Sequence, residues 1–480
     1  MNQPQIIQGG MGVAVSDWNL ARAVSSVGQL GVISGTAMDL VLARRLQLGD
    51  IGGHMKLALD HFPLPEMAAR IWDKYFVAGG KEEDAAHKSK PMHALKPPQA
   101  LDELMVVANF VEVWLAKHGH NGVVGINLLE KVQMPTLASL FGAMLAGVDY
   151  VLMGAGIPRH IPGALDKMAR LEKADLPINV VGAEAGDHFV NEFDPKGYVP
   201  EGMTSVIRPQ FLAIVSSGTL AIMLARKCSG PVNGFIIEGP TAGGHNAPPR
   251  GVMQISEAGE PIYGPKDVPD LQQFRDLGLP FWMAGSYGSA SGLQAALKEG
   301  ATGVQVGTAF AFCNESGLDP VLRAETLASS ATGKLKIFTD AKASPTGFPF
   351  KVVEVDDTIS NKAVYEARTR ICDLGYLRHA YKAPDGKVGY RCPAEPVEDF
   401  VRKGGDIAET VGRKCICNGL MATIGLGQAR KDGRHELPII TAGDHVQTIA
   451  EFLQPGQTSY SALDVINTLL GKVPAKIANS

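Results

Sequence analysis

A histidine on a glycine-rich loop is the main candidate for acid–base chemistry in this sequence. His245 follows Gly243 and Gly244, and the loop opens at Glu238, directly after the apolar run 234–237. Histidine has an ordinary pKa of about 6.5, so it can accept and release protons near neutral pH. The bare glycines would let a substrate or a planar ring come close to the imidazole. The pattern predicts His245 as a general base; the alternative is a surface histidine in a flexible loop.

Two later glycine-rich turns could hold a phosphate group. The residues concerned are Gly285, Ser286 and Tyr287 after the apolar run 281–283, and Gly307 and Thr308 after the run 303–306. Glycine has no Cβ, so backbone N–H groups can approach phosphate oxygens closely, and the Thr308 hydroxyl adds a donor. In a (β/α)8 barrel, the turns after the seventh and eighth strands are a common phosphate site. The alternative is that these glycines serve only the tight turns.

A third turn, near the N-terminus, could lie along a flat ring. Gln8 is followed by Gly9, Gly10 and Met11 after the first apolar run. Asn127, after the third run, carries an amide that can donate and accept hydrogen bonds, as the pyrimidine edge of a flavin requires. These residues are predicted to face a planar cofactor, and plain turn chemistry is the alternative for each.

The elements that must position these residues follow a repeating pattern. Short apolar, β-branched runs end in glycine or a small polar residue, and amphipathic stretches lie between most of them. The runs are 6–7, 31–33, 123–126, 150–153, 211–215, 234–237, 281–283 and 303–306. Helices are expected, for example, at 18–27, 137–146, 219–227 and 292–299. Eight such units predict an α/β fold of the (β/α)8 TIM barrel type rather than an open doubly wound sheet.

Two insertions and a C-terminal extension depart from this repeat. We expect residues 1–341 to form the barrel, with insertions at about 50–99 and 178–209 that could cover its mouth. Residues 342–480 are predicted to be a mainly helical extension packed on the barrel. Its helix candidates are 361–373 and 406–420.

Composition and charge exclude several classes of protein. The chain has 480 residues and a net charge of −4, which gives no electrostatic footprint for nucleic acid or an anionic membrane. No run of 18 apolar residues is free of charges and turn breakers, and no signal peptide is recognised. We therefore expect a cytoplasmic protein that acts on a small molecule. Glycine is in excess, at 55 residues, as expected of many tight turns.

The six cysteines are expected to be thiols. Four of them, Cys372, Cys392, Cys415 and Cys417, could hold zinc or an iron–sulfur cluster. A Cys-x-Cys pair with no second close pair is, however, a poor match to the usual spacing of such sites. Buried thiols are the favoured interpretation, and no metal is predicted.

Four motifs, taken together, resemble a known family. They are Gln8–Gly12, Gly243–His245, Ala284–Gly288 and Gly303–Thr308. In this order they resemble the nitronate monooxygenase (formerly 2-nitropropane dioxygenase) family, which also includes FMN-dependent enoyl reductases of fatty acid and polyketide synthesis. The resemblance covers about residues 4–315 and implies a (β/α)8 barrel that binds FMN non-covalently.

The resemblance also implies roles for individual residues. His245 matches the catalytic histidine, which acts as the base toward a nitroalkane. The residues expected to cradle the FMN phosphate are Gly285, Ser286, Tyr287, Gly307 and Thr308. Those expected along the ring or the ribityl chain are Gln8, Gly9, Gly10, Met11, Asn127 and Ser216 or Ser217. The residues expected to line the histidine loop are Glu238, Gly243 and Gly244.

The chain departs from the family pattern beside two of these motifs. The usual continuation of Gly-Gly-His, a small residue and then glycine, is replaced by Asn246–Gly251, and Ser286 stands where the family has the second glycine of Ala-Gly-Gly. Arg250 could pair with an anionic substrate such as a nitronate or a phosphate. Asn246 and Arg250 are therefore the candidate substrate residues.

The resemblance implies oxidation of nitronates or nitroalkanes by O2 to carbonyl compounds and nitrite. The alternative is an NAD(P)H-dependent enoyl thioester or quinone reductase, because Gly412–Leu420 resembles a stretch of the polyketide-type enoyl reductases. No Gly-x-Gly-x-x-Gly turn for a nicotinamide dinucleotide opens a helix. A third alternative is a barrel that has lost its cofactor and serves as a binding protein, against which the glycines of both phosphate turns argue. The sequence leaves open the substrate, the role of NAD(P)H and the oligomeric state.

Overall fold

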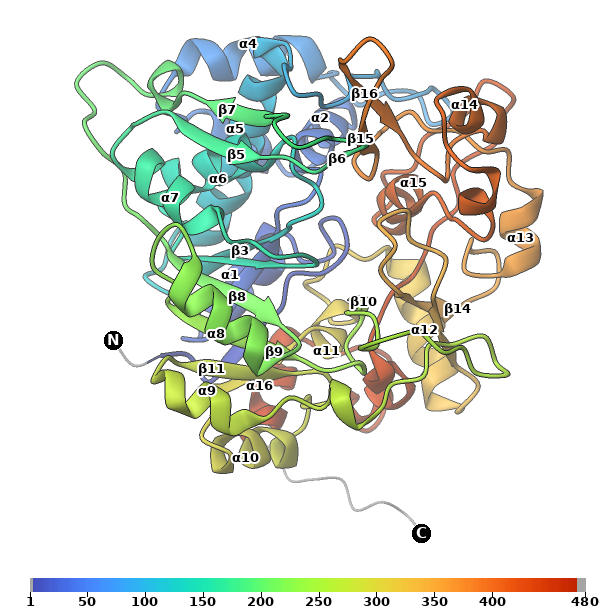
Figure 1. The fold of residues 1–480 in the computed structure, drawn as a ribbon. Coiled ribbons are helices and arrows are strands. Elements are labelled where there is room, and N and C mark those ends of the chain that lie inside the picture. The colour runs from blue at the N-terminus through green and yellow to red at the C-terminus, as the bar shows by residue number, and fades with distance from the viewer. Residues whose placement is uncertain (1–2, 473–480) are drawn as a thin grey trace.

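The computed structural model describes residues 3–472, which contain a closed parallel barrel of eight strands (Figure 1). The strands are β1 (Ile6–Gln8), β2 (Leu30–Ser34), β3 (Val124–Leu129), β4 (Tyr150–Gly154), β8 (Gln210–Val215), β9 (Gly234–Glu238), β11 (Phe281–Ala284) and β12 (Gly303–Val306). Ile7 pairs with Gln305 of β12 on one side and with Leu30 of β2 on the other, which closes the barrel. All eight apolar runs form barrel strands, so the predicted (β/α)8 fold is confirmed.

In each barrel strand, the side chains point alternately into the barrel and toward the surrounding helices, because successive side chains of a strand point to opposite faces. The residues of one buried cluster lie inside the barrel and include Ile7, Val32, Leu152, Leu212, Ile236 and Trp282. Their chain neighbours Ile33, Val151 and Phe211 belong instead to the larger cluster between strands and helices. The interior is thus a packed core, as in other barrels of this type.

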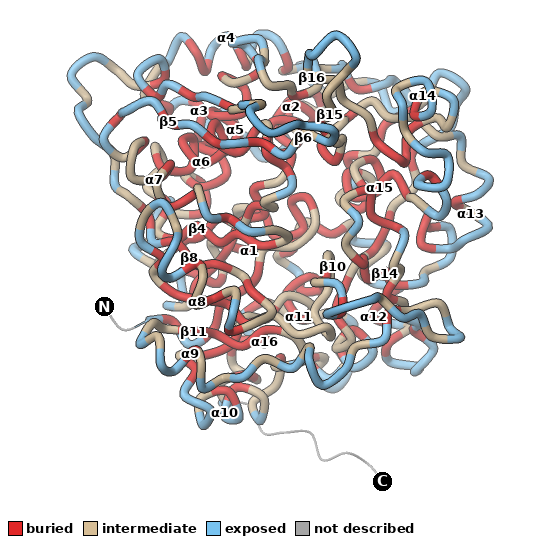
Figure 2. The backbone as a smooth tube through the Cα atoms, viewed as in Figure 1, coloured by how far each residue is buried: buried red, intermediate tan, exposed pale blue. Residues whose placement is uncertain are grey.

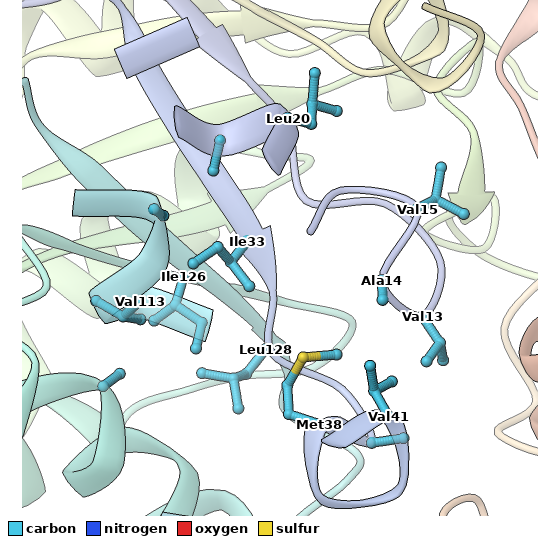
Figure 3. Packing of buried hydrophobic residues seen from close by; sticks show 14 of the residues in the cluster. Val13, Ala14, Val15, Leu20, Ile33, Met38, Val41, Val113, Ile126 and Leu128 are labelled. Atoms are coloured by element: carbon cyan, nitrogen blue, oxygen red, sulfur yellow. The ribbon is translucent and has the colours of Figure 1, made fainter. Parts of the chain in front are cut away.

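Helices pack around the outside of the barrel. They are α1 (Trp18–Ser25), α2 (Met38–Gln47), α5 (Gln99–Lys117), α6 (Thr136–Leu145), α7 (Ile161–Ala169), α8 (Gly218–Lys227), α9 (Leu271–Leu277), α10 (Ala290–Lys298) and α11 (Thr308–Ala311). The next helix, α12 (Pro320–Ala331), packs instead against the 3-10 helix η4 (Asp444–Phe452) of the C-terminal extension. Figure 3 shows part of the contact between strands and helices, in which Ile33, Ile126 and Leu128 lie near Met38 and Val41 of α2. The four helices predicted between strands are present, with ends shifted by one or two residues.

Both predicted insertions carry secondary structure of their own. The first contains α3 (His54–Leu59) and α4 (Pro65–Tyr75), followed by an irregular segment. The second contains β6 (Val180–Val181), β7 (Val190–Phe193) and the 3-10 helix η1 (Pro195–Tyr198), and β7 pairs with β5 (Ala174–Pro177). The strand β6 pairs with a strand of the C-terminal extension, so the second insertion joins the two parts of the chain.

The C-terminal extension contains strands as well as the predicted helices. Its elements, with β13 just before it, are β13 (Lys336–Asp340), β14 (Phe350–Glu354), β15 (His379–Lys382), β16 (Val388–Arg391), α13 (Lys362–Ala367), α14 (Val397–Arg402), α15 (Ile416–Thr423), α16 (Ala462–Leu469) and the 3-10 helices η3 (Ile407–Thr410) and η4 (Asp444–Phe452). The single helix predicted at 406–420 is wrong: Gly412 has a φ of +76°, which separates η3 from α15. Figure 1 shows most of the extension on the side of the molecule opposite α7 and α8.

Burial follows this architecture. Figure 2 shows buried backbone along the barrel strands and the helices next to them, with exposed loops at the periphery. The long helix α5 is largely enclosed, since 14 of its 19 residues are buried. Among residues 3–472, no helix is both long and apolar enough to cross a membrane.

Candidate active site

The floor of a cavity is formed by the last inward-facing residue of each barrel strand. Each of these residues lies two positions beyond an inward residue of the core, so the strand period alone places it at the carboxyl rim. The eight residues are Gly9, Ser34, Asn127, Gly154, Ile214, Glu238, Ala284 and Gln305, and all of them line the cavity. The strands thus deliver four small side chains, three polar ones and one apolar one to a single surface.

The small residues leave room for a flat group, and the polar ones offer it hydrogen bonds. A Cβ on Gly10 would lie 2.5 Å from Cβ of Asn127, and one on Gly9 would lie 3.2 Å from Cγ of Gln305. The Oε1 atom of Gln305 is buried and has no hydrogen-bond partner in the described chain. Such an atom is costly unless a ligand or water satisfies it. The bare backbone beside unpaired amides therefore fits a planar, hydrogen-bonding group such as a flavin ring.

The two predicted phosphate turns meet at one end of this cavity. Gly285, Ser286, Tyr287, Gly307 and Thr308 all line it. The backbone of Gly285 has a φ of +87° and that of Ser286 a φ of +58°. The second value explains why the related motif has glycine there, because left-handed backbone is unfavourable for residues with a Cβ.

The C-terminal extension closes this end of the cavity with residues that the sequence did not identify. Gly443 donates its backbone N–H to Oγ1 of Thr308 at 2.8 Å. His445 lines the cavity, and its Nδ1 lies 2.5 Å from the position that a Cβ on Gly288 would take. The other ring nitrogen, Nε2, lies 2.6 Å from Oε1 of Glu451. A phosphate at this end would lie among backbone N–H groups, the hydroxyls of Ser286 and Thr308, and the His445 imidazole.

The Gly285 turn can be tested through stability. We expect Gly285→Ala to lower the free energy of unfolding by about 1–2 kcal/mol for the left-handed φ alone, and by more because its Cβ would lie 2.8 Å from Oγ1 of Thr241. Gly278→Ala is the matched control, since its φ is +65° but its Cβ would meet nothing within 4 Å. Equal losses in urea unfolding of the two apoproteins would show that the turn is not crowded.

His245 is fixed by the C-terminal extension. The strand β10 (Gly244–His245) pairs with β14, and the imidazole meets the ring of Phe350 edge-on with 4.8 Å between ring centroids. Its Nε2 lies 2.7 Å from Oγ of Ser344. Burial lowers the pKa of His245 to about 4, because the cationic form is poorly solvated there. The side chain is therefore neutral at pH 7 and able to accept a proton.

Glu238 supplies a second titratable group at the same rim. It lines the cavity, and its carboxyl makes no hydrogen bond or ion pair with another described residue. Burial raises the pKa of Glu238 to about 8. The cavity thus holds an unprotonated imidazole and a protonated carboxyl at neutral pH, and two groups shifted in opposite ways are typical of acid–base sites.

An apolar wall faces the floor from the C-terminal extension. Leu377, Ile416, Cys417, Leu420 and Met421 line it. Tyr376 joins them and donates its hydroxyl to Oδ1 of the buried Asp39 at 2.6 Å. The sequence had not assigned these residues to the site. The likeness of Gly412–Leu420 to enoyl reductases was the one signal that pointed to part of this wall.

Five predicted site residues do not line this cavity. Gln8 is buried and holds the backbone of Val32 with both ends of its amide. Ser217 is the N-cap of α8, and Ser216 lies beside a small neighbouring hollow. Asn246 is buried and donates to the carbonyl of Ala242 at 3.0 Å.

Arg250 is the fifth of these residues. Its exposed side chain reaches the carbonyl of Ser216 at 3.3 Å, and its backbone N–H is held by Asp267. No lysine or arginine is among the described residues that line the cavity. The predicted pairing of Arg250 with an anionic substrate therefore has no support from the geometry.

The cysteines of the extension lie close together. Cys372, Cys392, Cys415 and Cys417 line one small hollow and are free thiols. Between residues 3 and 472, no group of three or more His, Cys, Asp or Glu side chains is arranged to hold a metal ion.

The central part of the site has a counterpart among known families. Residues 202–345 match the nitronate monooxygenase family model. This segment contains four barrel strands, the His245 loop and both phosphate turns. The resemblance inferred from the motifs is thereby confirmed for this segment. The segment belongs to a flavin-dependent oxidoreductase.

Solved structures give a likeness in fold only. Nitroalkane oxidase from Streptomyces ansochromogenes is 14% identical with a TM-score of 0.47, covering 98% of this chain and 96% of that one. FabK from Thermotoga maritima is 16% identical with a TM-score of 0.45, covering 98% and 93%. The enoyl reductase domain of MlnA from Bacillus amyloliquefaciens is 11% identical with a TM-score of 0.45, covering 98% and 94%. No curated protein matches the chain.

Proposed function

We propose that this protein is an FMN-dependent reductase that uses NAD(P)H to reduce an activated double bond in a neutral acyl compound such as an enoyl thioester. The observation that carries the proposal is the character of the cavity: an apolar wall lies beside His245 and Glu238, which are both uncharged at pH 7, and the described residues that line it include no lysine or arginine. Away from the proposed phosphate turns, an anionic substrate would lose its hydration there without gaining a lysine or arginine as a partner. A neutral substrate does not carry this desolvation cost.

The chemistry of such a reduction matches the two groups present. Reducing a carbon–carbon double bond next to a carbonyl consumes one hydride and one proton. A bound flavin supplies the hydride transfer, taking it from the nicotinamide and passing it on. The neutral His245 can hydrogen-bond the carbonyl oxygen, where negative charge develops, and the protonated Glu238 can release a proton.

The size and polarity of the wall support an acyl substrate. Ile416, Leu420 and Met421 all come from α15, and they line the same cavity as His245. An acyl chain of several carbons would bury its surface against them, which favours binding by about 25 cal/mol per Å² of apolar area. The smallest nitroalkanes would leave most of this wall uncovered.

Nitronate oxidation is the second candidate, and the state of His245 favours it. A neutral imidazole that lines the cavity can take the acidic proton of an uncharged nitroalkane, after which O2 would accept the electrons. The family match over residues 202–345 supports the same reaction. Binding of a preformed nitronate is less well supported, because it carries its charge into a cavity in which no described lining residue is a lysine or arginine.

Anaerobic flavin reduction separates the two candidates. We expect NADPH or NADH to bleach the bound flavin rapidly, and crotonyl-coenzyme A then to restore its colour without O2. Ethyl nitronate is expected to bleach it slowly or not at all. Rapid bleaching by the nitronate and none by either nicotinamide would replace the first proposal by the second. A colourless protein that cannot be reconstituted with FMN would contradict both.

The identity of the flavin can be tested through His445. We expect His445→Ala to weaken FMN binding by about ten- to a hundredfold, since a charge-assisted hydrogen bond to phosphate is worth about 1.5–3 kcal/mol. Riboflavin has no phosphate, and its affinity should stay within about twofold. Fluorescence quenching of each flavin gives the two dissociation constants. His188→Ala, at an exposed residue outside the cavity, is the control. Equal losses for both flavins would place the phosphate elsewhere.

A further inference from the structure

A second pocket lies against the apolar wall of the active-site cavity. The two share Tyr376 and Leu377, which line both. The second pocket is bounded by Lys131 in the loop after β3, by His93 of the first insertion and by Arg378 of the extension. Three segments far apart in the sequence thus converge beside the proposed substrate site.

The second pocket is rich in cationic groups. Lys131 and Arg378 line it, and none of its described lining residues is an aspartate or glutamate. The nearest ion pair of Lys131 is weak, with 4.0 Å between Nζ and Oε2 of Glu130. Arg378 donates through Nε to the carbonyl of Gly375 and through Nη2 to that of His93 at 2.6 Å. Its Nη1 has no partner in the described chain, so a charged donor remains for a ligand.

A buried and unpaired nitrogen adds to these cations. The side chain of His93 is 4% exposed, and its Nε2 lies 2.9 Å from Oδ2 of Asp39. The same carboxylate receives Lys90 at 2.7 Å and the Tyr376 hydroxyl at 2.6 Å. The remaining ring nitrogen of His93, Nδ1, is buried and has no hydrogen-bond partner. Because His93 lines the pocket, a ligand bound there could supply the partner that this buried atom lacks.

We propose that this second pocket is a subsite for a phosphate ester, which anchors the charged end of a substrate whose reactive end enters the active-site cavity. The inference rests on the proposed function, which places a neutral acyl group on the other side of Tyr376 and Leu377. Arginine and lysine are the usual partners of phosphate oxygens. The division of the two pockets, one without cations and one with them, suits a ligand that is apolar at one end and anionic at the other.

Equilibrium binding tests this assignment without requiring turnover. The probes are coenzyme A, pantetheine, which lacks the phosphates, and NADP+, each titrated calorimetrically into the FMN-loaded protein. We expect Lys131→Gln to weaken binding of one phosphate-bearing probe about three- to tenfold and to leave pantetheine unchanged. Arg378→Gln should have the larger effect. Lys227→Gln, an exposed lysine at the end of α8, is the matched control.

The two phosphate-bearing probes identify the ligand. Weaker coenzyme A binding with unchanged NADP+ binding assigns the subsite to the carrier of a thioester, and the reverse assigns it to the dinucleotide. If neither variant alters either probe relative to Lys227→Gln, the proposal is overturned. Lys131 is partly exposed, and its side-chain contacts within the described chain are the 4.0 Å ion pair with Glu130 and a 6.0 Å contact with the Phe348 ring, so its variant should fold normally. A protein that binds coenzyme A in this Lys131-dependent way but reduces no thioester would contradict the proposed function alone.

Discussion

Replacing His245 by alanine is expected to lower turnover by about 10²- to 10⁴-fold, which is the usual contribution of a positioned acid or base. The imidazole is neutral and faces the substrate space, whereas the residues proposed for the phosphate lie at the turns after β11 and β12. The FMN affinity of His245→Ala should therefore stay close to that of the native protein. Stopped-flow measurement of the two half-reactions and flavin titration give both quantities.

The half-reactions locate the defect within the catalytic cycle. If His245 assists the acyl substrate, flavin reduction by NADPH stays fast and reoxidation by the thioester becomes slow. Ser344→Ala removes the hydroxyl beside Nε2 of His245. It should slow the same half-reaction by a smaller factor, because the Ser344 hydroxyl only positions the imidazole ring. His188→Ala serves as the control at an exposed site. Native rates for thioester and nitroalkane substrates in His245→Ala would remove this residue from the mechanism.

The barrel and the floor of its cavity could be predicted from the sequence because both follow from local patterns. Alternation with a period of two defines each strand and also places residues such as Asn127 and Glu238 at the inward rim. Gln305 has the same placement. It belongs to the motif Gly303–Thr308, but the motif alone did not assign it to the site. Applying the period strictly at every strand end would have identified it.

The wall of the cavity could not be predicted in the same way. Tyr376, Ile416 and His445 come from a region without regular alternation, and only tertiary contacts bring them to the rim. Their placement depends on the pairing of β10 with β14 and of β6 with β15, which join distant segments. Each of these pairings joins strand segments of only two paired residues, and no local sequence pattern specifies which distant segment they pair with.

Arg250 illustrates what chain proximity alone leaves unspecified. It lies five residues after His245 and has suitable chemistry for an anion, so the sequence placed it near the substrate. Arg250 shares a small hollow with Glu238 but does not line the cavity itself, and its backbone is held by Asp267. The cations beside the proposed substrate site instead come from Lys131 and Arg378, more than a hundred residues away on either side.

Glu238→Gln is expected to remove the proton donor at all pH values and to lower thioester reduction about 10²-fold or more. In the native protein the carboxyl keeps its proton below its pKa of about 8, so the rate should be constant near pH 6–7 and fall as the pH rises through 8. The amide cannot ionise, and this fall should be absent from the profile of the variant. Glu257→Gln, an exposed glutamate of the loop after β10, should keep the native profile.

Stability gives a second readout that does not depend on turnover. Because the pKa of Glu238 is raised from 4.5 in the unfolded chain to about 8 in the folded one, the unfolded state gives up its proton first. The contribution of this group to stability is complete below pH 4.5 and is lost as the pH rises through about 8. Glu238→Gln should therefore become more stable than the native apoprotein as the pH increases over this window, in urea unfolding at a series of pH values. A constant difference across the window would mean that Glu238 is ionised in the folded protein and cannot be the proton donor.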